Sequence, residues 1–188
     1  MSLLIIITGS PATGKTAFAQ RLSKELEVPA FCKDFIKISL AENIPISNQE
    51  ESTRLSKATV SVMINIAQTL LSVGSSLILE ANFRPYEGEW IDALLKKYNR
   101  PCLTYLFGGE KKSLAKRFIE RDTTEERHEA NRTFKLLSVE EYEEAYKIFD
   151  GFKVRGNTVC VDATSFDNID YEALINIAAK ELSDSSSI

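Results

Sequence analysis

Eight consecutive residues near the N-terminus have the types and spacing needed to bind phosphate groups. They match the pattern G-x-x-x-x-G-K-[ST] in full: Gly9, Ser10, Pro11, Ala12, Thr13, Gly14, Lys15 and Thr16. Glycines let backbone N–H groups approach phosphate oxygens, and a helix that begins here adds its positive dipole end. Lys15 is expected to neutralise the β- and γ-phosphates, and the Thr16 hydroxyl to bind Mg²⁺. The sequence therefore predicts a P-loop (Walker A) site for ATP and Mg²⁺.

The residues on either side of this motif predict the elements that must position it. Residues 3–8 form a continuous apolar run, typical of a strand buried on both faces. Phe18, Leu22 and Leu26 follow at a spacing of four residues, which predicts a helix. A chance match in an ordinary loop would lack this strand–loop–helix context.

Two carboxylates follow other predicted strands. Asp34 comes after a short strand expected at residues 30–33, where parallel sheets open toward ligands, and could accept a proton from a hydroxyl. The alternative for Asp34 is a helix N-cap or a solvated loop acid. Glu80 ends the next apolar run and could hold Mg²⁺, or could be an ordinary strand-end carboxylate. Asn82 and Arg84 follow closely and could contact an acceptor or a phosphate.

Four arginines, Arg117, Arg121, Arg127 and Arg132, lie on or after a helix expected at residues 110–121. Arg117 and Arg121 are four residues apart and therefore share one helix face. The segment beyond them is highly charged and poor in apolar anchors, which favours a mobile segment.

This segment, at about residues 122–137, is predicted to be a lid that closes over ATP and excludes water. Its arginines would steady charge on the transferring phosphoryl group. The alternative is a solvated helix face, since acidic residues are interleaved with the arginines.

Short apolar runs alternate with longer helical patterns along the chain, which predicts an α/β fold with a mostly parallel sheet. Further strands are expected at residues 77–81, 101–107 and 158–161. Two capping-box signatures, Ser47 with Glu50 and Ser138 with Glu141, should begin helices. The first of these helices would present Leu55, Val62, Ile66 and Leu70 on its buried face. We expect one domain over residues 1–183 and a disordered tail at residues 184–188.

Composition narrows the class of protein. The 188 residues suit a single domain, and the net charge of −4 provides no basic field for nucleic acid. No segment has the roughly 18 apolar residues of a membrane span, and the N-terminus lacks signal-peptide features, so a cytoplasmic protein is expected. Cys32, Cys102 and Cys160 are interpreted as buried thiols in a reducing compartment. A single histidine argues against a zinc site.

The motif Gly9–Thr16, together with Asp34, Glu80–Asn82 and the arginine stretch, resembles the small P-loop kinases of the zeta-toxin and chloramphenicol-phosphotransferase type. These are AAA-like ATPase or kinase domains, to which gluconate and shikimate kinases are more distantly related. The resemblance extends from Leu3 to about Leu182. It implies a three-layer α/β/α P-loop NTPase fold whose five-stranded parallel sheet has the order 2-3-1-4-5.

The same resemblance implies roles for individual residues. Asp34 would be the base, and Arg117, Arg121 and, less directly, Arg127 would flank the adenine and the phosphates. The loop after the last strand would contact adenine near Thr164. Two departures are notable: Lys37 stands where many relatives have an arginine, and Glu80 replaces the more usual aspartate.

These observations favour an ATP-dependent kinase that transfers the γ-phosphoryl group to a hydroxyl of a small molecule. Lys15, Asp34, Arg117 and Arg121 would be its catalytic residues. One alternative is a nucleotide or nucleoside monophosphate kinase, whose acceptor phosphate would be held by Arg54 or Arg84. A second alternative, from a different class, is an ATPase or nucleotide-dependent switch without a small acceptor.

Four aromatic residues lie near the strand ends that should face the acceptor: Phe35, Phe83, Tyr86 and Trp90. They could line a pocket for a ring-bearing acceptor, or they could belong to the core. The acceptor class and the oligomeric state are left open.

Overall fold

Strand β1 (Leu4–Gly9) lies at the centre of the sheet because its side chains are apolar on both faces. The computed structural model describes residues 2–124, 128–132 and 138–186. Its other strands are β2 (Ala30–Cys32), β3 (Leu77–Glu80), β4 (Cys102–Gly108) and β5 (Asn157–Asp162). All neighbouring strands pair in parallel, in the order β2-β3-β1-β4-β5. The predicted α/β class and strand order are therefore confirmed.

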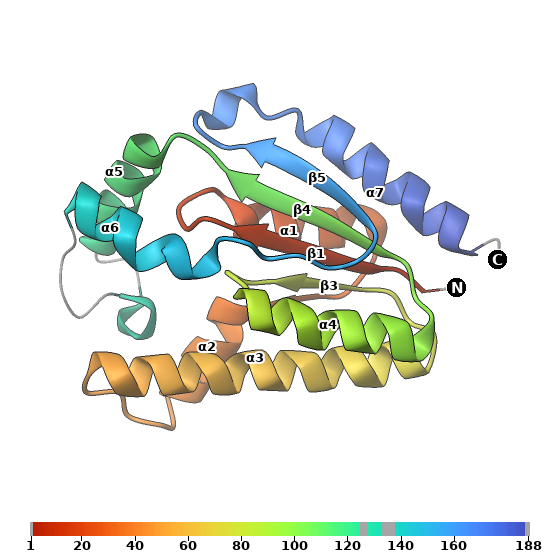
Figure 1. The fold of residues 1–188 in the computed structure, drawn as a ribbon, viewed down its shortest axis with the longest axis horizontal. Coiled ribbons are helices and arrows are strands. Elements are labelled where there is room, and N and C mark those ends of the chain that lie inside the picture. Colours follow the sequence, from red (N-terminus) through yellow and green to blue (C-terminus); the bar gives the residue numbers. More distant parts are fainter. Residues whose placement is uncertain (1, 125–127, 133–137, 187–188) are drawn as a thin grey trace.

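Helices cover both faces of this sheet (Figure 1). Helices α1 (Lys15–Leu26) and α7 (Tyr171–Ser186) pack against one face, where Ile5 and Ile7 of β1 point. Helices α3 (Gln49–Ser72) and α4 (Pro85–Tyr98) pack against the other, where Leu4 and Ile6 point. The alternation of β1 side chains thus joins two apolar cores into a three-layer α/β/α domain.

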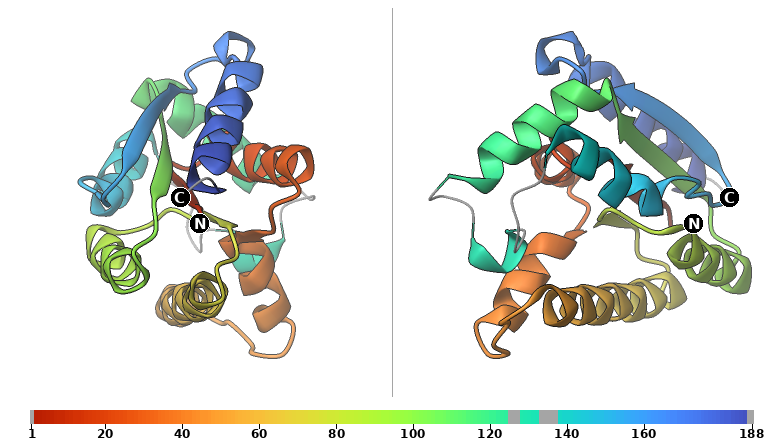
Figure 2. Two further views of the ribbon diagram at one scale, coloured as in Figure 1. Left: turned by 90° about the vertical axis from the view of Figure 1, so that its right-hand side faces the viewer. Right: turned by 60° about the vertical axis from the view of Figure 1, so that its left-hand side comes forward.

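The remaining elements gather near the carboxyl ends of the strands (Figures 1 and 2). They are α2 (Lys33–Ala41), α5 (Lys111–Asp122), η1 (Glu129–Asn131), α6 (Val139–Tyr146) and η2 (Lys147–Phe149), and a further turn, η3 (Phe166–Asn168), follows β5. This is the edge where parallel α/β folds bind ligands.

Helix α3 differs from its prediction in two respects. Its N-cap is Asn48, whose side chain accepts a hydrogen bond from the Glu51 N–H at 3.0 Å, one residue later than the expected box. Its buried face carries Leu55, Met63, Ala67 and Leu71, whereas Val62 is 41% exposed. The predicted set Val62, Ile66 and Leu70 lies one residue away from this i+4 series, which rotates it by about 100° around the helix.

The capping box at Ser138 and Glu141 is confirmed at the start of α6. Cys32 and Cys102 are buried, but the expectation for Cys160 is wrong, because Cys160 is exposed on the edge strand β5. Helix α7 continues to Ser186, so residues 184–186, which were expected in a disordered tail, are helical. Within the described ranges, no helix combines the length and apolar character needed to cross a bilayer.

Candidate active site

The P-loop connects the end of β1 to the start of α1 in a conformation that needs glycine. Gly9 has φ +118°, and a Cβ there would lie 1.9 Å from the Phe107 carbonyl oxygen of the adjacent strand. Gly14 has φ +79° and is the N-cap of α1. The Ser10 N–H donates to the Phe107 carbonyl at 2.9 Å, which ties the loop to β4. The backbone is thus held at the N-terminal end of α1, where an anion is favoured.

Lys15 is 5% exposed and folds back onto the loop that precedes it. Its Nζ donates to the Ser10 carbonyl at 2.5 Å and to Thr13 Oγ1 at 3.3 Å. Burial lowers the pKa of this amine to about 8, although Glu80 and Asp34 act in the opposite direction. A bound phosphate would therefore provide the counter-charge that favours the protonated amine.

Thr16 and Glu80 meet beside this lysine, from the first turn of α1 and the end of β3. The Thr16 hydroxyl donates to Glu80 Oε2 at 3.1 Å, and Glu80 is 4% exposed. Burial raises the pKa of the Glu80 carboxyl, whereas the charge of Lys15 opposes that rise. The two side chains supply hard oxygen donors, which suit Mg²⁺ with phosphate oxygens and water completing its coordination.

A cavity of about 270 Å³ lies over the P-loop. Besides the loop itself, it is lined by Asp34, Glu80, Asn82 and Arg121. Asp34 occupies the first turn of α2, whose N-cap is Cys32, so Asp34 is not the N-cap that the alternative interpretation required. The Asn82 side-chain amide donates to the Gly9 carbonyl, which fixes it against the P-loop. The structure therefore brings Lys15, Thr16, Asp34, Glu80 and Arg121 together.

Arg117 lies elsewhere, although it shares a helix face with Arg121. Its guanidinium donates to the carbonyl oxygens of Ala12 at 3.1 Å, of Thr164 at 3.0 Å and, more closely, of Ala163. Arg117 therefore joins the P-loop to the loop that follows β5 and does not line the phosphate cavity among its described residues. The predicted residue Arg127 lies outside the described residues.

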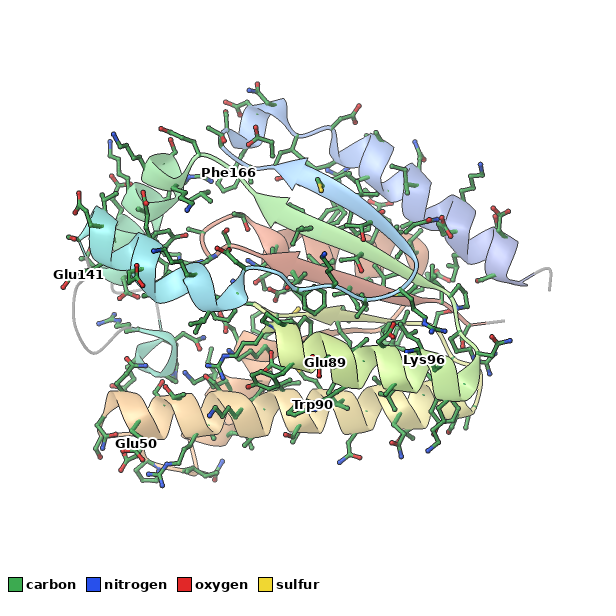
Figure 3. The ribbon with its side chains drawn as sticks, viewed as in Figure 1. Glu50, Glu89, Trp90, Lys96, Glu141 and Phe166 are labelled. Atoms are coloured by element: carbon green, nitrogen blue, oxygen red, sulfur yellow. The ribbon has the colours of Figure 1, made fainter. Side chains whose placement is uncertain are left out.

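Phe166 is a site residue that the sequence reasoning missed. The Arg117 guanidinium lies 4.4 Å from the centroid of its ring, and a Cβ placed on Gly14 would be 3.3 Å from a ring carbon. The ring is 43% exposed and extends from the loop after β5 (Figure 3). Thr164 is on the same loop and its N–H donates to Asp162 Oδ1 at 2.8 Å. The sequence signal that could have identified Phe166 is an aromatic residue soon after the loop that was expected to contact adenine.

A larger cavity, of about 550 Å³, adjoins the phosphate cavity and shares Asn82 with it. Its walls come from α2, α3, the start of α4, η1, and the α6–η2 segment. We call it the acceptor cavity. The four aromatics proposed for this region are not among its described lining residues. Phe83 is in the core against Phe152, and Phe35 and Trp90 are exposed on the surface. Tyr86 packs against Trp90, and its hydroxyl accepts a hydrogen bond from Arg84 at 3.0 Å.

The expected lid is partly described. Beyond α5, the Arg132 guanidinium donates to the Thr124 carbonyl at 2.8 Å, and η1 contacts α2. Helix α6 packs on α5 through Tyr142 and Phe118, and the Tyr142 hydroxyl donates to the Pro11 carbonyl at 3.2 Å. The segment at residues 122–137 is therefore bracketed by two helices that contact the P-loop.

Comparisons with known proteins identify the family and the fold of the chain. A family model described as an AAA domain matches residues 4–136. A candidate kinase from Chloroflexus aurantiacus superposes with a TM-score of 0.82 at 26% identity, covering 98% of this chain and 97% of that one. No curated protein matches the sequence.

Two more distant structures share the fold. A gluconokinase from Sinorhizobium meliloti 1021 has a TM-score of 0.57 at 12% identity, covering 97% of this chain and 93% of that one. Kti12 from Chaetomium thermophilum, in complex with ADP-AlF3, has a TM-score of 0.63 at 15% identity, covering 95% and 98%. The same fold is thus common to proteins with different names.

Proposed function

The chain belongs to this AAA-domain family, and we propose that it is an ATP-dependent kinase that phosphorylates a hydroxyl of a small molecule. The observation that carries the proposal is the position of Asp34. Its carboxylate lines the same cavity as Lys15, Thr16 and Glu80, and Asn82 connects that cavity to a second one. The second cavity, at about 550 Å³, has the size of a small-molecule site.

Each site residue has one part in the transfer. The acceptor oxygen attacks the γ-phosphorus of ATP, the bond from that phosphorus to the β–γ bridging oxygen breaks, and ADP leaves. Asp34 accepts the proton of the acceptor hydroxyl. Lys15 and Arg121 face the phosphate cavity and stabilise the charge on the transferring group.

Thr16 and Glu80 would hold Mg²⁺, which supplies further charge neutralisation at the β- and γ-phosphates when bound. Arg117 and Phe166 lie against the P-loop at Ala12 and Gly14, beside Thr164, and we assign them to the nucleotide base. By the resemblance to the zeta-toxin and chloramphenicol-phosphotransferase type, Arg127 would be a lid residue that flanks the adenine and the phosphates.

The two alternatives have less support. Of the two arginines suggested for a nucleoside monophosphate, Arg84 lines the acceptor cavity, but Arg54 lines a separate surface hollow beside Ile44 and Leu55. An ATPase or switch without a small acceptor would not need a second cavity next to the phosphate cavity.

The test is ADP formation by the purified protein with MgATP, against a panel of hydroxyl compounds and nucleoside monophosphates. We expect one hydroxyl compound to accelerate ADP formation, and Asp34→Asn to reduce that gain by about 10²- to 10⁴-fold with little change in ATP affinity. Asp184→Asn, an exposed aspartate of α7, is the matched control and should leave the rate unchanged. Full acceptor-dependent turnover in Asp34→Asn would remove Asp34 from the mechanism.

A further inference from the structure

The acceptor cavity has a strongly one-sided charge. Among the lining residues that the structure describes, five carry positive charge: Lys33, Lys37, Lys57, Arg84 and Arg132. One carboxylate, Glu87, lines it in the same described set. We propose that the acceptor is an anionic hydroxyl compound, and that a carboxylate or phosphate which does not react binds to this cationic wall. This inference rests on the proposed kinase function and names the class of its substrate.

Helices α2 and α3 deliver three of the five positive charges to the same cavity. Lys33 and Lys37 are about one turn apart on α2, so Lys37 lies about 6 Å further along the helix from the end of β2. Lys37 is 6% exposed, and its Nζ donates to Ser52 Oγ of α3 at 2.8 Å. Lys57 lies on α3 beyond Ser52, on the same cavity wall. The wall therefore combines ammonium groups with a hydroxyl, and ammonium groups form strong charge-assisted hydrogen bonds with carboxylates and phosphates.

The carboxylate of Glu87 is already used within the protein. It is buried, and its Oε2 accepts the Arg84 N–H at 2.6 Å as part of the capping box that begins α4. Its charge is therefore directed at the helix start, where an acidic side chain is favoured. The cations of α2 and α3 line the same cavity as Glu87.

The cationic wall would also reduce an electrostatic repulsion between the two substrates. An anionic acceptor is repelled by the γ-phosphate of ATP, and positive side chains around the acceptor offset that repulsion. Beyond these cations, Val60 of α3 and Tyr146 and Phe149 of the α6–η2 segment offer apolar surface on which a carbon skeleton can pack. The cavity thus fits a molecule whose hydroxyl points to Asn82 and whose charged end points to α2 and α3.

The charge of the acceptor can be measured before its identity is known. A small-molecule extract of the source cells would be separated at pH 7 on a strong anion exchanger, and each fraction incubated with the protein and [γ-³²P]ATP. We expect a new labelled product only from the retained fractions. A product made from the unretained, neutral fraction would overturn the inference but leave the kinase function intact. No product from any fraction would count against the kinase function itself, and the inference would fall with it.

Treatment of the active fraction with alkaline phosphatase separates the two kinds of anion. If the acceptor activity is lost, the charged group is a phosphate monoester; if it persists in retained fractions, the group is a carboxylate or a phosphodiester, which this enzyme does not cleave. If the treated acceptor stays active but is no longer retained, its charge is not needed and the inference is wrong.

Charge reversal at the cavity wall provides a second test with the fractionated acceptor. Lys57 is exposed, so Lys57→Glu should fold, and it should raise the KM for the acceptor by at least about tenfold without changing the KM for ATP. Lys180→Glu, on the exposed side of α7, is the matched control and should change neither value. An unchanged acceptor KM in Lys57→Glu would contradict binding of an anion at this wall.

Discussion

The Thr16 hydroxyl donates a 3.1 Å hydrogen bond to Glu80 Oε2 and so joins the first turn of α1 to the end of β3. Neither residue is near the other in sequence, but β1 and β3 are neighbours in the sheet, with Ile7 opposite Glu80. The pair therefore forms directly beside the P-loop, where phosphate oxygens would arrive. This geometry makes Glu80 the acidic partner for Mg²⁺ in our proposal.

Glu80→Gln should weaken the response to Mg²⁺. The amide keeps the shape of the side chain but removes its charge, so we expect about a 10- to 100-fold higher Mg²⁺ requirement for ATP turnover. A Mg²⁺ titration at saturating ATP measures this effect. Glu89→Gln, an exposed glutamate on α4, is the control. Identical Mg²⁺ curves for the wild type and Glu80→Gln would exclude Glu80 from metal binding.

The same variant should change how stability depends on pH. Because burial raises the pKa of Glu80 above its usual value of 4.5, the folded protein holds this proton more tightly than the unfolded chain. The stabilisation is therefore complete below about pH 4.5 and is lost as pH rises through the raised pKa. Relative to the wild type, Glu80→Gln should become progressively more stable as pH rises across that window. Denaturant unfolding at several pH values measures the difference, and a constant difference would be contrary evidence.

ATP affinity should depend on the protonation of Lys15. In the free protein the pKa of Lys15 is about 8, and bound phosphates should raise it. Affinity for ATP without Mg²⁺ should thus be highest below pH 8 and should fall as pH rises from 8 to 9.5. Titration calorimetry should detect proton uptake at pH 8.5. In Lys15→Met the affinity should be weaker and independent of pH over this range, and a wild-type affinity that does not change with pH would refute the assignment.

Arg117 and Arg121 should have separable effects. Arg121 lines the phosphate cavity, so Arg121→Gln should lower kcat by about 10²-fold while changing the KM for ATP less. Arg117 contacts the loop around Thr164 and stacks on Phe166, so Arg117→Gln should mainly raise the KM for ATP and reduce discrimination between ATP and GTP. Steady-state kinetics of both variants provides the comparison. The reverse pattern would exchange the two roles.

Gly9→Ala should destabilise the protein strongly. The new Cβ would lie 1.9 Å from the Phe107 carbonyl oxygen at a φ of +118°, so β1 and β4 would have to move apart. Gly108→Ala, at the end of β4, is a matched control, because a Cβ there meets nothing within 4 Å. We expect a loss of about 2 kcal/mol or more in Gly9→Ala and much less in Gly108→Ala. Equal losses by thermal or denaturant unfolding would contradict the close approach.

The strands were predicted well because each parallel strand is a short apolar run, whereas their order was expected from the resemblance to small P-loop kinases. The sequence also predicted that Lys15, Thr16, Asp34 and Glu80 lie at one edge of the sheet, because residues that follow parallel strands meet at that edge. The rotation of α3 was not predicted, because two apolar series, one through Val62 and one through Met63, compete on that helix. Only packing against β3 and α4 selects between them.

The two parts of the site that sequence reasoning missed depend on tertiary contacts. Phe166 reaches Arg117 because the loop after β5 turns back over the P-loop, which no local pattern records. The cationic wall combines Lys37 with Lys57 from two helices that follow different strands. Helices α2 and α3 lie side by side in the fold, as Figure 2 shows. The sequence alone does not indicate that the two lysines line one cavity.

The most direct measurement is the fate of the γ-phosphoryl group of [γ-³²P]ATP in the presence of the active acceptor fraction. Our account predicts that the label moves to an organic product in proportion to ADP formed, and that Asp34→Asn prevents this transfer while still binding ATP. Label that appears only as inorganic phosphate, at a rate that neither an acceptor nor Asp34→Asn changes, would contradict the account and would indicate an ATPase or nucleotide-dependent switch.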